Sequence, residues 1–284
     1  MPLAALGLLA LSASLHTLWN LLLKQSPDKM AVSWWTTVIG SALALPILLV
    51  IGLPPRPMWP FLAASVAAEA FYYILLAKAY QRSDFSQAYP IARGAAPAFL
   101  TLWSILFLRE YPSPGGYLGL LMIMAGLMLV GSGNFDVRNN LAQTLRSIGP
   151  ALGTAVMIST YTVIDGTAVR LGPSLPYALS IFLLVPLALT PFILPRYPWA
   201  QLAACWRGQA WRLPLISILG MIAYALALGA YQLAPVSYAG AIREMSVVFG
   251  ALAGWLFLKE GFGRARVTGA IIVFAGILII SIYG

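Results

Sequence analysis

The sequence predicts an all-α polytopic membrane protein, with ten transmembrane helices arranged as two inverted five-helix repeats. Three observations lead to this fold class. Of the 284 residues, 61% are hydrophobic and only 9% are charged, whereas a soluble domain carries roughly 25% charged residues. The apolar residues fall into runs of about 20 residues, which is the length that crosses a bilayer. Several short motifs also recur about 150 residues apart, which indicates an internal repeat.

Apolar runs bounded by charged residues, prolines and glycines give the expected helices in chain order. The predicted spans are residues 2–23, 31–52, 59–80, 86–108, 114–132, 147–170, 174–195, 212–233, 236–258 and 265–283. Residues 195–211 contain three tryptophans and two arginines, and this composition suits a segment that lies in the membrane interface.

The internal repeat places matching motifs in the two halves of the chain. Phe107-Leu108-Arg109-Glu110 recurs as Phe257-Leu258-Lys259-Glu260, and Ala125-Gly126 recurs as Ala275-Gly276. Residues 1–133 and 147–284 then form the two repeats, and a polar linker at 134–146 joins them. Because each repeat has an odd number of spans, the two copies enter the membrane in opposite orientations. Inverted repeats of this kind are the usual construction of secondary transporters.

The composition excludes several classes of function. The chain has one cysteine, Cys205, and one histidine, His16, so a cysteine-cluster metal site and a two-histidine zinc motif are both excluded. No nucleophile elbow or phosphate-binding loop is present, and we expect neither an enzyme nor a bound metal or cofactor. The net charge of +9 is attributed to membrane topology and anionic headgroups rather than to nucleic acid.

The repeated motifs resemble those of the drug/metabolite transporter superfamily, in its EamA-type branch of ten helices. Leu108-Arg109-Glu110 ends one predicted helix and is similar to that family's Leu-Gly-Glu signature, and a glycine-bearing helix follows it. Leu258-Lys259-Glu260 repeats the pattern, and neither copy keeps the glycine. The resemblance implies secondary transport without ATP hydrolysis and a central cavity between the halves. Substrates in that superfamily range from amino acids to nucleotide sugars and cationic drugs, so the resemblance does not choose one.

Polar and ionisable side chains inside spans are costly and therefore mark candidate sites. In the first span, His16 and Asn20 lie one helical turn apart beside Trp19. The matching positions in the sixth span are Tyr161 and Asp165. These residues fit a proton-sensitive, hydrogen-bonding wall of a substrate cavity. The alternative is that neighbouring helices simply satisfy them.

Glu69 lies at the centre of the third span, and Tyr73 follows it one turn later. A carboxylate at this depth is a candidate proton carrier or cation ligand. Its counterpart in the second half is Gly220, and asymmetry at a charged position favours function over architecture. Tyr89 and Tyr224 also fall within spans and could line a cavity suited to cationic or amphipathic substrates.

Arg93 in the fourth span and Arg243 in the ninth occupy the same place in the repeat. An arginine keeps its proton, so each requires a counter-ion or an anionic substrate. Two inward arginines could grip a carboxylate or phosphate together. The alternative is a pair of salt bridges to Glu69, Asp165 or Glu244 that lock the two halves.

Together these residues predict a secondary active transporter that moves a small organic metabolite by alternating access. An amino-acid-like or zwitterionic solute fits the mixture of carboxylates and arginines best, and coupling could involve protonation of Glu69, Asp165 or His16. Export of cationic or amphipathic drugs is the second interpretation, and a lipid flippase or scramblase is the alternative of another class. The expected partners are a small-molecule substrate and membrane lipid. The expected state is a monomer or homodimer in the bacterial inner membrane.

The orientation of the termini is left open by two arguments that conflict. Eleven lysines and arginines lie in the predicted loops at one end of the spans and three lie in loops at the other end. The positive-inside rule then places both termini outside. The family resemblance instead implies that both termini lie inside.

Overall fold

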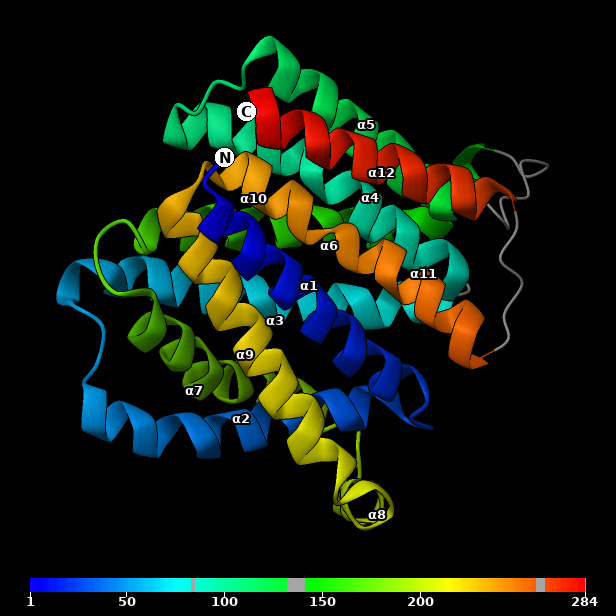
Figure 1. The fold of residues 1–284 in the computed structure, drawn as a ribbon. Coiled ribbons are helices and arrows are strands. Elements are labelled where there is room, and N and C mark those ends of the chain that lie inside the picture. Colours follow the sequence, from blue (N-terminus) through cyan, green and yellow to red (C-terminus); the bar gives the residue numbers. More distant parts are fainter. Residues whose placement is uncertain (83–84, 132–140, 259–263, 284) are drawn as a thin grey trace.

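The computed structural model describes residues 1–82, 85–131, 141–258 and 264–283, and this part of the chain is helical with no strand. The first half contains α1 (Leu3–Lys24), α2 (Lys29–Ile51), the 3-10 helix η1 (Arg56–Met58), α3 (Trp59–Arg82), α4 (Phe85–Trp103), the π-helical turn η2 (Ser104–Leu108) and α5 (Pro114–Gly131). The second half contains α6 (Leu141–Ala168), α7 (Ser174–Ile193), α8 (Trp199–Gln209), α9 (Arg212–Leu233), α10 (Val236–Arg243), α11 (Met245–Leu258) and α12 (Arg264–Tyr283). Figure 1 shows their arrangement.

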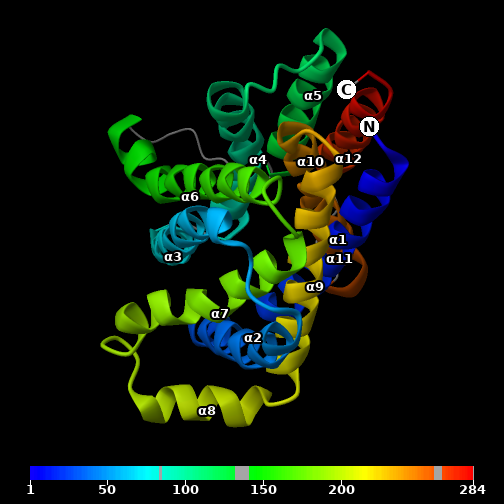
Figure 2. The same cartoon turned by 90° about the vertical axis from the view of Figure 1, so that its left-hand side faces the viewer.

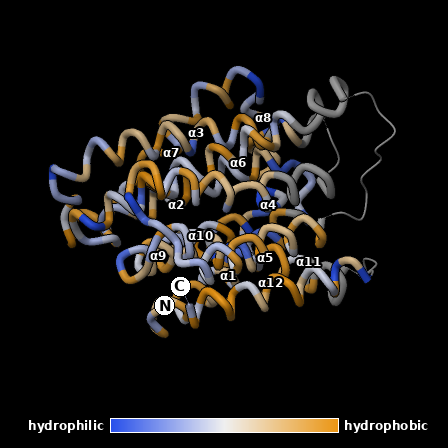
Figure 3. Tube along the Cα trace, turned by 90° about the horizontal axis from the view of Figure 1, so that it is seen from above, coloured by the Kyte–Doolittle hydropathy of each residue, from blue (hydrophilic) through white to orange (hydrophobic). Residues whose placement is uncertain are grey.

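Several of these helices have the length and composition of membrane spans. Within the described residues, six qualify: Leu3–Leu23, Lys29–Ile51, Arg56–Leu76, Ser174–Ile193, Arg212–Leu233 and Arg264–Tyr283. Ala92–Leu108 and Pro114–Val130 are shorter apolar helices. Hydrophobic residues run along α5 and α12, while hydrophilic stretches lie mostly at helix ends (Figure 3). The polytopic membrane class is therefore supported, whereas length and composition support only part of the predicted set of ten spans.

The predicted ninth span, 236–258, is two helices rather than one. α10 ends at Arg243 and α11 begins at Met245, with Glu244 between them. The first interruption is marked by Pro235, the N-cap residue of α10, because proline lacks the backbone N–H that would continue the preceding helix. The second interruption, at Glu244, has no such sequence marker.

Two other helix boundaries differ from the sequence prediction. α6 begins at Leu141, so the last residues of the predicted 134–146 linker are helical; residues 132–140 lie outside the described part. The segment predicted for the interface forms the separate helix α8. It is seen end-on in Figure 1, where α2 runs across the view, and from the side in Figure 2.

Three contacts hold α8 against the helices beside it. The Trp35 indole N–H donates to the carbonyl oxygen of Leu202 at 2.9 Å, and the Gln201 side-chain amide donates to Asp28 at 3.1 Å. The Ser26 hydroxyl donates to Gln209 at 2.8 Å. α8 therefore belongs to the folded body and is not a detached loop.

The helices α5 and α12 approach each other at two pairs of glycines. A Cβ on Gly119 would lie 2.8 Å from the carbonyl oxygen of Gly276, and one on Gly276 would lie 2.7 Å from that of Gly119. Gly126 and Gly269 show the same relation at 2.6 Å in both directions. The pairing runs in opposite directions along the chain, so the two helices are antiparallel. Only glycine permits this backbone separation.

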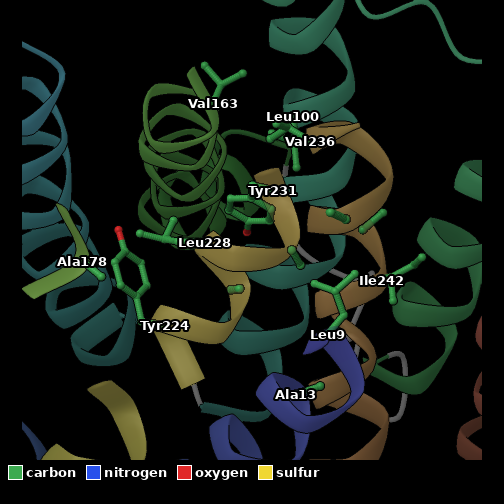
Figure 4. Packing of buried hydrophobic residues seen from close by; sticks show 14 of the residues in the cluster. Leu9, Ala13, Leu100, Val163, Ala178, Tyr224, Leu228, Tyr231, Val236 and Ile242 are labelled. Carbon is green, nitrogen blue, oxygen red and sulfur yellow. The ribbon is translucent and has the colours of Figure 1, made fainter. Parts of the chain in front are cut away.

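The centre of the molecule is built where helices of the two halves interleave. α3 packs on α6, α1 packs on α9, and α2 packs on α7. The α9 side chains Tyr224, Leu228 and Tyr231 are buried there with Ile242 of α10 (Figure 4). The two chain ends also meet, because the N-terminal ammonium of Met1 donates to the Ser281 carbonyl oxygen at 3.1 Å.

Candidate functional site

A cavity of about 100 Å³ lies between the helices of the two halves. Most of the residues chosen from the sequence line it: His16, Trp19, Glu69, Tyr73, Arg93, Tyr161, Tyr224 and Arg243. Asn20, Asp165 and Glu244 are not in its lining, and the side chain of Tyr89 lies outside the described residues. Helix packing therefore brings most of these side chains to one cavity, and their part in transport stays a prediction.

Arg93 is neutralised within the protein. Its Nη1 lies 3.0 Å from Oε1 of Glu244 in a salt bridge, and each residue is only 4% exposed. The pair joins α4 to the break between α10 and α11. Two roles were considered for Arg93, a salt bridge between the halves and the binding of an anionic substrate group. The geometry fits the salt bridge.

His16 faces more hydrogen-bond donors than it can satisfy. The Trp19 indole nitrogen lies 3.2 Å from its Nδ1, and Nη2 of Arg93 lies 2.9 Å from its Nε2. A neutral imidazole has one acceptor nitrogen and a protonated one has none. A neutral His16 can therefore accept from either Trp19 or Arg93, whereas a protonated His16 could accept from neither and would place a second positive charge beside Arg93. This geometry fits a neutral acceptor better than a proton carrier.

Arg243 differs from Arg93, because it forms no ion pair with a described residue. Its Nη1 donates to the Tyr231 hydroxyl at 3.3 Å, and its guanidinium carbon lies 5.9 Å from the centre of the Tyr224 ring. Its Nε is buried without a hydrogen-bond partner among the described atoms. A buried cation in a cavity wall with an unused donor is suited to an anionic group of a ligand.

Asp165 is fully buried behind the cavity wall. The Tyr177 hydroxyl donates to its Oδ1 at 2.9 Å, and the Tyr224 hydroxyl donates to its Oδ2 at 2.6 Å. Since Tyr224 itself lines the cavity, the carboxylate fixes the position of a lining side chain. Asp165 thus positions the lining side chain of Tyr224 and is not itself part of the cavity lining.

Glu69 and Asn20 differ in whether their side chains face the cavity. Glu69 lines the cavity and forms no ion pair with a described residue. Asn20 turns back on its own helix, where its amide donates to the His16 carbonyl oxygen at 2.7 Å. Glu69 therefore faces the cavity beside Tyr224, whereas Asn20 is occupied locally.

The signature residue Glu110 lies away from the cavity, at the start of α10. Its Oε2 accepts from the backbone N–H of Val236 at 2.9 Å and of Ser237 at 3.4 Å, and its Oε1 pairs with Arg170. Pro235, at the N-cap position, offers no side-chain acceptor, so Glu110 supplies the negative group that a helix N-terminus favours. One carboxylate therefore ties the end of α4 to the end of α6 and the start of α10.

The residue before it, Arg109, has a backbone conformation that favours glycine. Arg109 has φ 54° and ψ 32°, and it is the one non-glycine residue with positive φ in the described part of the chain. Glycine adopts this left-handed conformation without the Cβ clash that other residues meet. Arg109 therefore holds a conformation to which glycine is better suited.

Some residues of the site were missed by sequence reasoning. Thr36, Thr37, Phe182, Ile216 and Ser217 line the cavity, but hydroxyl and apolar residues of this kind are common in any membrane helix. The partner of Asp165, Tyr177, carried no signal either. A search for hydroxyls at helical spacing would have returned too many alternatives, so only helix packing identifies them.

Comparison with known proteins gives a consistent result. The model of the EamA-like transporter family matches residues 3–132 and 146–282. The uncharacterized transporter YwfM of Bacillus subtilis (strain 168) is 24% identical over 227 residues, which cover 78% of this chain and 73% of that protein. Solute carrier family 35 member G1 of Mus musculus is 26% identical over 265 residues, which cover 87% of this chain and 70% of that protein.

A solved structure supports the same fold. A protein crystal structure superposes with a TM-score of 0.76 at 17% identity, over 99% of this chain and 96% of the other. At that identity the likeness shows the fold alone. With the family model matched over most of the sequence and apolar helices of spanning length, the chain belongs to the EamA-like transporter family and is an integral membrane transporter.

Proposed function

We propose that this transporter moves a small zwitterionic, amino-acid-like solute by alternating access. One observation carries the proposal: Arg243 and Glu69 line the same cavity, and neither forms an ion pair with a described residue. Arg243 would bind the carboxylate of the solute, and Glu69 would bind its ammonium group. The other buried charges are already used, since Arg93 pairs with Glu244 and Asp165 accepts from two tyrosines.

The rest of the lining suits a small polar solute. Thr36, Thr37 and Ser217 contribute hydroxyl groups, and Tyr72 and Tyr73 contribute aromatic surface. The cavity volume of about 100 Å³ is well below the roughly 300–1,000 Å³ of pockets that take drug-sized ligands. The size therefore favours a metabolite over an amphipathic drug in this conformation.

The proposed architecture is ten spans in two inverted repeats, residues 1–133 and 147–284. Exchanging the halves turns the α3–α6 packing into the α1–α9 packing, and both pairs are in contact. The glycine pairs of α5 and α12 are related in the same way. The family model also matches two separate segments. These relations support a two-fold arrangement in which one half can rock against the other.

The contacts support a state that is closed at one end. Glu110 and Arg170 hold α4, α6 and α10 together there, and the Tyr238 hydroxyl accepts from the Ser113 backbone N–H at 3.0 Å. The cavity residues Trp19 and Ile216 lie toward the other end, where α1 finishes and α9 begins next to α8. Opening of the Glu110 contacts would be the step that exposes the solute at the closed end.

The test of the function is uptake by proteoliposomes. We expect saturable uptake of a neutral zwitterionic amino acid, driven by a pH gradient, and loss of the response to that gradient in Glu69→Gln. Gly220 provides the folding control, because it lines the cavity and a Cβ there meets nothing within 4 Å. Gly220→Phe should fill the cavity and abolish uptake, while Gly220→Ala should retain it.

Other outcomes of the same assay would decide against the proposal. Uptake of a cationic drug without uptake of the zwitterion would support the export interpretation. Translocation of a labelled lipid headgroup without solute flux would support a flippase or scramblase. Unchanged transport and an unchanged pH profile in Glu69→Gln would remove this carboxylate from the coupling mechanism.

The orientation follows from a separate measurement on Cys205 of α8. The loop charges favour a cytoplasmic position for α8. A membrane-impermeant maleimide should then label Cys205 in permeabilised but not in intact cells. Burial raises the pKa of the Cys205 thiol and the Asp28 carboxylate adds to the increase, so labelling should accelerate as the pH is raised, because the thiolate is the reactive form. Labelling in intact cells would place both termini inside.

A further inference from the structure

A second cavity lies outside the transport site, between α2 and α8. It has a volume of about 360 Å³ and is lined by Trp35, Trp199, Ala203, Trp206 and Arg207. Apart from the Arg207 guanidinium, the lining consists of aromatic rings and a methyl group. Nothing in the proposed transport cycle uses these residues.

The walls of this cavity are held in fixed positions. The Trp35 ring lies 4.9 Å from the Trp206 ring and 6.0 Å from the Trp199 ring, measured between centroids. The Trp35 ring is oriented by its hydrogen bond to the Leu202 carbonyl oxygen. Leu202 on another face of α8 is fully buried, so the helix presents its tryptophan face to the pocket.

The pocket is formed by α8, the segment whose composition predicts a position in the membrane interface. α8 lies across the direction of α2, and it is seen end-on in Figure 1 and from the side in Figure 2. Trp199 is 63% exposed and Trp206 is 38% exposed. Tryptophan is enriched at headgroup level in membrane proteins, and a helix in the plane of the interface is positioned to contact lipid directly.

The positive charge of Arg207 in the pocket lining favours a lipid headgroup that carries a net negative charge. Three tryptophan rings alone would suit a quaternary ammonium group, but the Arg207 guanidinium in the lining repels a cation. Arg207 forms no ion pair with a described residue. An exposed guanidinium beside an apolar surface is complementary to a phospholipid, whose phosphate group is joined through glycerol to apolar acyl chains.

We propose that the pocket between α2 and α8 binds one anionic phospholipid. Its phosphate lies on Arg207, and its glycerol backbone and upper acyl chain lie against Trp35, Trp199 and Trp206. The site is distinct from the transport cavity, although α2 connects them: Trp35 faces the lipid, and the following Thr36 and Thr37 line the cavity. A bound lipid would therefore hold α2 and α8 together at the edge of the transport site.

The test is native mass spectrometry of the full chain in detergent, titrated with dioleoylphosphatidylglycerol or dioleoylphosphatidylcholine. We expect the first phosphatidylglycerol to bind about fivefold more tightly than phosphatidylcholine, which is the factor that one arginine near the surface contributes. Arg207→Gln should remove this preference. Arg56→Gln, which removes an exposed arginine at the opposite end of the spans, should retain it.

A second pair of variants tests the aromatic wall. Trp206→Leu should weaken binding of both lipids, whereas Trp59→Leu, which alters an exposed tryptophan at the opposite end, should leave both unchanged. The proposal is overturned if Arg207→Gln keeps the phosphatidylglycerol preference, if phosphatidylcholine binds more tightly to the wild type, or if Trp206→Leu leaves lipid affinity unchanged.

Discussion

Arg93 and Arg243 stand 150 residues apart at matching positions of the predicted sequence repeat, yet their surroundings differ. Both are nearly buried, with exposed fractions of 4% and 7%. Both line the cavity, but Arg93 has a carboxylate partner in Glu244 at 3.0 Å, whereas Arg243 donates to a tyrosine hydroxyl. The same residue type thus connects the helices in one half and, in the proposed function, binds the solute in the other.

The cause of the difference is the residue that follows each arginine. Arg243 is followed by Glu244, which reaches across to Arg93. Arg93 is followed by Gly94, which has no side chain to reach back to Arg243. Glu69 and its counterpart Gly220 show the same kind of asymmetry within the cavity wall. In both cases a glycine in one half corresponds to a charged residue in the other half, so the proposed two-fold arrangement of the helices does not extend to these charges.

The largest expected effect is on stability, from breaking the buried ion pair. Arg93→Gln should lower the free energy of unfolding by about 3–5 kcal/mol, because it leaves the Glu244 carboxylate buried without its counter-ion. The measurement is the unfolding transition in detergent. The double variant Arg93→Gln with Glu244→Gln should recover most of the loss. A double variant as unstable as the single one would show that the ion pair is not the reason.

Arg243 is expected to show the opposite pattern, with a large effect on transport and a small one on stability. Arg243→Gln should raise the KM for a zwitterionic solute about 10- to 100-fold, the range that a charge-assisted hydrogen bond contributes. Uptake kinetics in proteoliposomes measure this, with the melting temperature as control. An unchanged KM, or a loss of stability equal to that of Arg93→Gln, would contradict the assignment of Arg243 to solute binding and of Arg93 to stability.

A smaller effect is expected at the far end of α10, the helix that carries Arg243. Glu110→Gln should reduce stability by about 1 kcal/mol through loss of charge at the helix N-terminus. It should also increase accessibility at the closed end. Cysteine introduced at Ser113 and probed with a soluble thiol reagent, in the Cys205→Ser background, would report the opening. Equal labelling with and without Glu110→Gln would exclude Glu110 from closure.

The smallest expected effect concerns the backbone at Arg109. Arg109→Gly should raise the free energy of unfolding by up to about 1 kcal/mol, because glycine adopts φ 54° without strain. Arg109→Ala removes the same charge and keeps the Cβ, so it is the matched control. Stabilisation by alanine equal to that by glycine would assign the effect to charge instead of backbone conformation.

Sequence reasoning reached the site residues unevenly, for identifiable reasons. Glu69, Arg93 and Arg243 were found because a charge inside an apolar run is conspicuous. Tyr177 and Ser217 were not found, because hydroxyl residues occur throughout such helices. The division of a predicted span at Glu244 was also missed, since no proline or glycine marks it.

The sequence by itself determined that the protein lies in a lipid bilayer, that it is helical, and that only a few charged residues lie within its apolar helices. The first two properties follow from the composition and from the length of the apolar runs. The third follows from the positions of the charged residues within those runs. Only the tertiary structure decided which charges are paired, because pairing depends on distances between helices far apart in the chain. Glu244 neutralises Arg93 at a separation of 151 residues, while the adjacent Arg243 forms no ion pair with a described residue.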